Sequence, residues 1–274
     1  MSRVVAAVAV AVTGVAVAFL TLPLIALFVR VPPGDLLRAL GTSAAQDALL
    51  VSIKTSAIAH ALVLLVGTPA AYVIARRRFR GRAVVLSLIE LPLVLPPAVA
   101  GIALLVTFGR LGLLGGTLDA LGVQVVFTQV AVVLAVAFVE APFYLRGAVA
   151  SFEAVDATLL DAARTLGARP ARVFARVALP LAAGGLAGAS ALALARGLGE
   201  FGATLIFAGS LQGVTQTLPL AIYAQFEADL DLALAIGVLF VIFGALVLLA
   251  LKLIPQWTRF VSTSTFRSAI SPSA

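Results

Sequence analysis

Long apolar runs without a charged residue constrain the fold of this chain more than any other feature of its sequence. Residues 4–29 form one such run of 26 positions, and residues 232–251 form another. A helix of about 20 apolar residues spans the hydrocarbon core of a bilayer. The second run holds fourteen Leu, Ile, Val or Phe residues. At roughly −0.3 to −0.6 kcal/mol each, their insertion energies sum to about −4 to −8 kcal/mol as an upper bound. Both runs therefore predict membrane-spanning helices.

The composition extends this prediction to the whole chain. Hydrophobic residues make up 62% of the sequence and charged residues 11%, whereas soluble domains average about 25% charged residues. A cleaved signal peptide is the alternative for residues 4–29, but this run is longer than the apolar core of a signal peptide, about 7–15 residues. We expect an all-α membrane protein with six transmembrane helices, at about residues 4–29, 48–75, 83–108, 128–145, 181–208 and 232–251.

These segments divide the chain into three parts. Residues 1–47 hold the first helix and an extracytoplasmic link, residues 48–254 hold a core of five helices, and residues 255–274 form a cytoplasmic C-terminal tail. A proline inside a helix removes a hydrogen bond and kinks or breaks the helix. We therefore expect the third helix to be interrupted at its prolines, Pro92, Pro96 and Pro97.

The distribution of positive charge predicts the orientation in the membrane, because cytoplasmic loops accumulate Lys and Arg. With six spans, one side collects fourteen positive charges and the other collects three, while Lys54 and Arg196 lie within spans. Five of the fourteen are arginines of residues 76–82, which we also expect to contact anionic lipid. Both termini and the polar segment 146–180 are therefore predicted to be cytoplasmic.

Within that polar segment, residues 153–176 have the pattern of a helical hairpin. Asp156 or Thr158 can cap a first helix, since their side-chain oxygens accept hydrogen bonds from free amides of the first turn. Gly167 suits the left-handed position that ends a helix, and Pro170 suits the first turn of a second one. The pattern predicts two short helices that meet near Gly167.

One face of the first short helix is small and apolar. We expect Ala162, Ala163 and Leu166 to share this face, with Arg164 and Arg169 at its sides. Such a surface fits a groove on another protein. An ordinary solvated loop between two spans is the alternative.

Residues 161–180 resemble the "EAA" loop of binding-protein-dependent ABC importer permeases. That loop reads Glu-Ala-Ala, three residues, Gly, nine residues, and Ile-x-Leu-Pro. This chain has Ala162 and Ala163, then Gly167 after three residues, and 177–180 as Val-x-Leu-Pro, with Asp161 in place of the first Glu. The resemblance implies a type I ABC importer permease fold, in which the loop is a cytoplasmic coupling helix that sits in a groove of the ATP-hydrolysing subunit. The residues it assigns to docking are Asp161, Ala162, Ala163, Arg164, Leu166, Gly167 and Arg169.

The chain itself has no phosphate-binding loop ending in Gly-Lys-Ser/Thr, because its two lysines follow Ile53 and Leu251. Another polypeptide must therefore bind any ATP, and the chain is expected to be a transport subunit, not an enzyme. It has no cysteine and one histidine, so we expect neither a metal nor a cofactor. Its arginines cluster beside apolar spans, which argues against nucleic-acid binding. The resemblance implies as partners two copies of an ABC ATPase subunit, a second copy of this chain, an extracytoplasmic oxyanion-binding protein and the lipid bilayer.

A second resemblance bears on the substrate. Residues 195–209, which include Leu-Gly-Glu-Phe-Gly-Ala-Thr, and the Thr-Gln-Thr-Leu-Pro of 215–219 resemble the fifth span and following link of molybdate-type permeases. Related sulfate permeases typically have Tyr for Phe201 and Ser for Ala203. The resemblance implies a molybdate permease in a bacterial or archaeal cytoplasmic membrane. Tungstate is chemically too close to molybdate to be separated from it, and sulfate or thiosulfate is the alternative.

Charged residues within the spans have two interpretations. Arg196 and Glu200 are four apart and can pair on one helical face, while each costs at least about 2.5–3.5 kcal/mol near the bilayer centre. The pair either braces the packing of the span or belongs to the translocation path. A carboxylate does not suit a dianion, so we do not expect Glu200 to be a direct ligand. The candidate path or gate residues are Arg196, Gly199, Glu200, Phe201, Thr204 and Glu140.

Other polar residues near the spans leave alternatives open. Pro142 makes a helix distortion an alternative role for the Glu140 region. We expect Lys54 and His60 to extend toward the interface or to contact a partner, and Glu90 to pair with a nearby arginine. An ATP-independent secondary transporter that uses Glu140 and Glu200 for ion coupling is an alternative function, and a membrane scaffold without transport is another.

Overall fold

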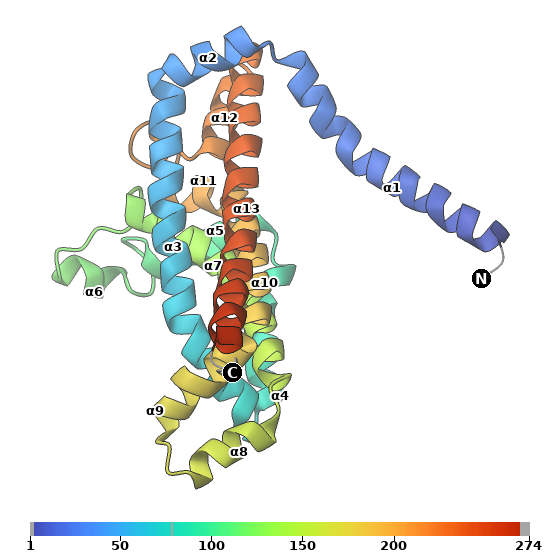
Figure 1. The fold of residues 1–274 in the computed structure, drawn as a ribbon. Helices are drawn as coiled ribbons and strands as arrows, with labels where there is room; N and C mark the ends of the chain where they lie inside the picture. The colour runs from blue at the N-terminus through green and yellow to red at the C-terminus, as the bar shows by residue number, and fades with distance from the viewer. Residues whose placement is uncertain (1–2, 78, 269–274) are drawn as a thin grey trace.

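The computed structural model describes residues 3–77 and 79–268, and all the regular elements in these residues are helices (Figure 1). Arg78 of the predicted arginine cluster and residues 269–274 of the predicted tail lie outside this part. The elements, in chain order, are α1 (Arg3–Arg30), α2 (Pro33–Gly41), α3 (Ser43–Arg76), α4 (Arg82–Val94), α5 (Pro97–Phe108), α6 (Gly115–Ala120), α7 (Gln129–Glu153), α8 (Ala157–Thr165), α9 (Pro170–Val173), the π-helical turn η1 (Phe174–Ala178), α10 (Leu179–Leu198), α11 (Gly202–Ala208), α12 (Leu218–Phe226) and α13 (Leu230–Ser268).

The predicted six-span, all-α fold is confirmed over the described chain. Five continuous helical segments are long and apolar enough to cross a bilayer, and α4 with α5 forms a sixth, bent candidate. The axes of α4 and α5 differ by 114°, and the break falls at Leu95 and Pro96. The bend at Pro96 and Pro97 follows from the sequence, because proline lacks an N–H and forces the residue before it into extended backbone. The interruption expected at Pro92 is wrong, because Pro92 lies inside α4, which continues to Val94.

The helices place the hairpin and the C-terminal end of α13 at one end of the bundle, and α2 and α12 at the other (Figure 1). Helix α7 packs between α3 and α10. Helix α1 extends away from this bundle, and none of its described residues is buried. An apolar helix without buried residues is suited to contact with lipid. The centre of the bundle is instead formed by α3, α7 and α10, which pack against one another.

One segment differs from the sequence predictions, and two others contain helices where the sequence analysis predicted no particular structure. The link before the second span contains helix α2, which has a proline in its first turn. The fifth span is not one helix, because α10 ends at Leu198 and α11 begins at Gly202. Helix α13 continues to Ser268, so residues 255–268 of the expected C-terminal tail are helical, and the cytoplasmic location of this tail stays a prediction.

The second helix of the hairpin also differs from its prediction, since it is not short but continues through Pro180. Residues 170–198 form one helical segment that passes from the hairpin into the fifth span. In η1 the Leu179 N–H donates to the Phe174 carbonyl, five residues earlier. Pro180 has no N–H for the carbonyl four residues earlier, and the wider π turn accommodates the proline within the helix.

An aromatic cluster attaches the hairpin to the bundle. Phe152, at the end of α7, is fully buried, and its ring meets Tyr72 of α3 edge-on with centroids 5.3 Å apart. Phe174 of η1 packs on the same Tyr72 ring at 4.9 Å. Leu160 and Val173 of the hairpin are buried in the same cluster. The hairpin therefore shares the core of the bundle.

Candidate functional site

The docking hairpin begins and turns where its sequence predicts. Asp156 is the cap of α8, because its carboxylate accepts a hydrogen bond of 2.9 Å from the Thr158 backbone N–H. That bond holds the pKa of Asp156 below its ordinary value. Gly167 has a φ of +82°, the left-handed conformation expected of it. Pro170 stands in the first turn of α9, also as expected.

The exposed face of the hairpin differs from the predicted one. Ala163 is half-buried and packs against the core together with the buried Leu160. Leu159, Ala162 and Leu166 are exposed instead, with Leu166 at 88% of its accessible surface. The sequence interpretation missed Leu159, although the spacing of 159, 162 and 166 follows one face of a helix. We call these three residues the docking face.

The other predicted docking residues surround this face. Asp161 and Arg164 form an ion pair of 2.7 Å, and both are exposed. Gly167 and Arg169 are exposed as well. Thus six of the seven predicted docking residues lie on the surface of the hairpin, and Ala163 does not.

Two arginines clamp the base of the hairpin to α3. Arg76 Nη2 donates to the carbonyls of Phe152 and Val155, each at 2.6 Å. Arg82 pairs with Glu153, and its Nε donates to the Ile74 carbonyl at 2.9 Å. The sequence interpretation gave these arginines a role in topology and lipid contact. The structure gives Arg76 and Arg82 a further role, because their hydrogen bonds connect the α7–α8 junction to the end of α3.

The interruption of the fifth span is organised by Glu200. This residue lies between α10 and α11 and is 2% exposed. One carboxylate oxygen accepts a hydrogen bond of 3.1 Å from Arg196 Nη1, and the other accepts one of 2.8 Å from the Ala203 backbone N–H. The predicted Arg196–Glu200 pair is therefore confirmed, but it bridges a break and not one helical face. Both oxygens of Glu200 are satisfied within the chain.

The remaining predicted path residues gather at the same break, except Glu140. Gly199 follows the last residue of α10, and Phe201 packs on the Tyr223 ring of α12 at 5.1 Å. Thr204 of α11 is fully buried, and its hydroxyl has no hydrogen-bond partner among the described residues. A buried polar group that no described residue satisfies therefore lies close to the break.

The break in the fifth span lies against the break in the third. A Cβ at Gly202 would stand 2.7 Å from Cβ of Pro97, and one at Gly101 would stand 2.9 Å from the Ala203 carbonyl oxygen. Glycine at these two positions therefore lets α5 and α11 touch closely. The prolines of the third span predict its break, whereas the break in the fifth span and the contact between the two were not predicted from the sequence. Helical backbone can be interrupted at membrane depth only where protein or a water-filled cavity receives the freed groups.

Glu140 belongs to a different contact. It is fully buried on α7, and Oε1 pairs with His60 Nδ1 of α3. The other ring nitrogen of His60 lies 2.9 Å from the Ser190 hydroxyl of α10. The expectation that His60 extends toward the interface or a partner is therefore wrong, because it is buried and paired inside the bundle. Lys54 is exposed, and α7 continues through Pro142 without a break.

The expected pairing of Glu90 is confirmed, with Arg146 Nε 3.5 Å from its carboxylate. Both side chains are substantially exposed, at 44% and 69%. Exposed pairs of this kind contribute about 0–1 kcal/mol to stability. This pair is therefore a peripheral contact.

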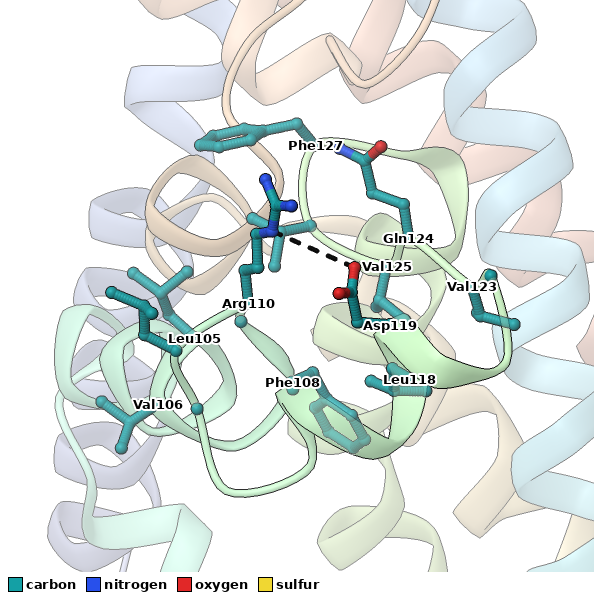
Figure 2. Close-up of a pocket in the computed structure, with 16 residues that line it drawn as sticks. Leu105, Val106, Phe108, Arg110, Leu118, Asp119, Val123, Gln124, Val125 and Phe127 are labelled. Carbon is teal, nitrogen blue, oxygen red and sulfur yellow. Dashed lines mark ion pairs between the residues drawn. The ribbon is translucent and has the colours of Figure 1, made fainter.

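An open pocket of about 800 Å³ lies in the link between α5 and α7. Figure 2 shows Arg110 and Asp119 facing each other across it, with 4.0 Å between Nε and Oδ1. Phe108 and Leu118 are part of its apolar lining. Arg110 is one of the three positive charges that the sequence places on the outward side. The pocket itself was not predicted, because its lining is brought together by the folding of a glycine-rich link that includes α6.

Comparison with known proteins identifies the protein class. The family model described as "Binding-protein-dependent transport system inner membrane component" matches residues 64–260. The chain belongs to this family. The matched part of this permease includes the docking hairpin and both broken spans.

Individual relatives agree with this assignment. The permease is 48% identical over 233 residues to the molybdenum transport system permease protein ModB of Mycobacterium tuberculosis, which covers 85% of this chain and 88% of the relative. It is 36% identical over 200 residues to the sulfate transport system permease protein CysW of Synechococcus elongatus, covering 72% of this chain and 70% of that one. These proteins are named as permease components, and this chain is accordingly a multi-pass inner-membrane transport component.

Solved structures show the same fold. A chain of a bacterial ABC transporter that imports the acidic polysaccharide alginate superposes on this permease with a TM-score of 0.72 and 16% sequence identity. The match covers 92% of this chain and 95% of that one. The predicted type I ABC importer permease fold is thereby confirmed.

Proposed function

We propose that this permease is the membrane subunit of an ATP-driven importer for molybdate, or for the nearly identical tungstate. The relative named for molybdenum transport shares 48% of its aligned residues, and the one named for sulfate shares 36%. Phe201 and Ala203, beside the Glu200 break, are the residues that the resemblance associates with the molybdate type, whereas sulfate permeases typically have Tyr and Ser there. Sulfate or thiosulfate is the alternative oxyanion.

The observation that carries the proposal is the docking face on a braced hairpin. Three exposed apolar side chains stand on a hairpin that shares the core of the bundle and is clamped by Arg76. An exposed apolar patch on a rigid support suits a protein partner. We assign this partner as an ABC ATPase subunit, with two copies docking on two permease chains and the path along their two-fold axis.

The route from the hairpin to the path is a continuous helix. Nucleotide binding closes the two ATPase subunits and displaces the hairpins. Because residues 170–198 form one helical segment, this segment carries the displacement from the hairpin towards the Gly199–Phe201 break. There α11 rests on α5, so movement of one interruption moves the other. The permease performs no covalent chemistry, and its part is to change which side of the break is open.

The orientation follows from charge. The fourteen-to-three distribution of Lys and Arg favours a cytoplasmic hairpin with cytoplasmic termini. A cytoplasmic docking face is accessible to an ATPase, and the opposite end, which carries α2 and α12, is the side to which an oxyanion-binding protein delivers substrate. Glu200 repels an anion and has both oxygens occupied, so it holds the break and does not bind substrate.

The test is reconstitution of the permease with its ATPase subunit and binding protein in proteoliposomes. Molybdate and tungstate should stimulate ATP hydrolysis and uptake through the binding protein, and sulfate should stimulate them much less. If sulfate but neither molybdate nor tungstate stimulated ATP hydrolysis and uptake, the substrate would be sulfate and the molybdate assignment would be refuted. Uptake by the isolated permease without ATP would instead support a secondary transporter and refute the proposal.

A further inference from the structure

One buried side-chain cluster joins the three central helices of the permease. His60 comes from α3, Glu140 from α7 and Ser190 from α10. Their exposed fractions are 9%, 0% and 8%. His60 uses both ring nitrogens, Nδ1 toward Glu140 and Nε2 toward Ser190. We call these residues the His60 cluster.

Burial of the His60 cluster costs free energy that apolar packing of the three helices would not cost. A charged or ionisable side chain within a membrane span costs at least about 2.5–3.5 kcal/mol unless it is paired. Glu140 Oε2 has no hydrogen-bond partner among the residues the structure describes. Apolar residues of similar size often replace a buried ion pair without loss of stability. Packing alone therefore does not account for the cluster, whereas a requirement for one specific helix arrangement does.

The cluster lies between the two parts of the permease that must be coupled. Glu140 precedes the end of α7 at Glu153 by thirteen residues, which is about 20 Å of helix. Ser190 precedes the end of α10 at Leu198 by eight residues, which is about 12 Å. The docking hairpin is attached at one end of this helix pair, and the Glu200 break lies at the other.

Helices α7 and α10 are in close contact along this length. A Cβ at Gly147 would lie 2.6 Å from Cβ of Ala189, and one at Gly197 would lie 2.9 Å from Glu140 Oε2. Gly185 faces Ser151 with equally little space. Close backbone approach at small residues is typical of tightly associated transmembrane helices. The pair α7–α10 is thus suited to move as one body, and His60 adds α3 to it.

We infer that His60 is a positioning residue for transport, because it holds α3 in register with α7 and α10 so that hairpin displacement reaches the Glu200 break. This inference rests on the proposed ATP-driven function. Loss of the cluster would leave the helices packed but would let α10 shift relative to α3. ATP hydrolysis would then continue with less oxyanion moved per ATP.

Three variants test the contact of His60 with Glu140 and its contact with Ser190 separately. His60→Asn retains a nitrogen near the position of Nδ1 and loses the contact with Ser190, while His60→Gln retains one near Nε2 and loses the contact with Glu140. Ser190→Ala removes the hydroxyl that contacts His60 Nε2, and it removes little volume. The matched control is Ser151→Ala, since the Ser151 hydroxyl lies on the same α7–α10 contact and, among the described residues, donates its hydrogen bond to the Gly147 carbonyl of its own helix.

The measurement is oxyanion uptake per ATP hydrolysed by the complete complex in proteoliposomes, alongside the melting temperature of each variant. A buried hydrogen bond is worth roughly 1 kcal/mol, or about fivefold in an equilibrium. The uptake-to-ATP ratio should fall by about that factor in Ser190→Ala and His60→Asn and stay unchanged in Ser151→Ala. Ser190→Ala keeps the test decisive if a His60 variant does not fold.

A wild-type ratio in Ser190→Ala and His60→Asn, whatever their melting temperatures, would overturn the positioning role and leave the proposed function intact. No ATP-driven uptake by the wild-type complex would overturn the proposed function and this inference with it. The wild-type sample therefore distinguishes the two failures.

Discussion

Substitution of Glu200 by glutamine is the sharpest single perturbation of the proposed gate. The two side chains have the same size, so the glutamine can still accept the hydrogen bond from the Ala203 N–H with its remaining oxygen. What is lost is the charge opposite Arg196, 3.1 Å away. A hydrogen bond between charged groups contributes about 1.5–3 kcal/mol. The Arg196 side chain is 33% exposed, so we expect the lower half of this range.

A loss of this size changes the balance between two arrangements of the break by about tenfold or more. We therefore expect Glu200→Gln to lower ATP-driven uptake at least about tenfold. The amount of permease in the membrane should remain near the wild-type level, because the substitution removes a charge from a span and so does not oppose insertion. Uptake into vesicles and quantification of the permease in the same vesicles measure the two effects separately.

The matched control is Glu90→Gln. It makes the same chemical change at an ion pair with Arg146 whose side chains are 44% and 69% exposed. Such a pair is worth about 0–1 kcal/mol, so uptake should stay close to that of the wild type. Wild-type uptake by Glu200→Gln would remove Glu200 from the mechanism. A parallel fall in uptake and in membrane-inserted protein would show that Glu200 only braces the packing.

Two further substitutions test the docking face and the contact between the two breaks. Leu166→Asp should weaken co-purification of the ATPase subunit, since truncation of a central interface residue can cost about 2 kcal/mol or more of binding free energy. The control Leu211→Asp, also at an exposed leucine, should have no effect. Retention of the ATPase subunit by Leu166→Asp would contradict the docking assignment. Gly202→Ala should lower the melting temperature, because its Cβ would lie 2.7 Å from Cβ of Pro97 and overpacking costs about 1–3 kcal/mol of stability. The control Gly188→Ala has open space around its Cβ and should leave the melting temperature unchanged. Equal melting temperatures of the two variants would refute the close packing of α5 on α11.

The features that the sequence predicts correctly are those that depend on neighbouring residues. Gly167 ends α8 because a left-handed backbone favours glycine, and Pro170 starts α9 because its fixed φ suits a first helical turn. Pro96 and Pro97 break the third span by removing backbone donors. Each of these effects acts within a few residues and can therefore be predicted from the sequence.

The features that the sequence does not predict depend on partners far along the chain. His60 pairs with Glu140, eighty residues away, and with Ser190, which lies farther still. The contact of Gly202 with Pro97 is likewise set by how α11 meets α5. Periodicity identifies a helix face but not the helix that covers it, which explains why Ala163 was expected on the docking face and packs inward instead.

The most direct test of the account is which side of the membrane the docking face is on, and what covers it. The chain has no cysteine, so Leu166→Cys introduces a single reactive thiol on the most exposed leucine of the hairpin. A membrane-impermeant thiol reagent should modify it only from the cytoplasmic side, and the docked ATPase subunit should block that reaction. Modification from the extracytoplasmic side, or equal modification with and without the ATPase subunit, would contradict the account.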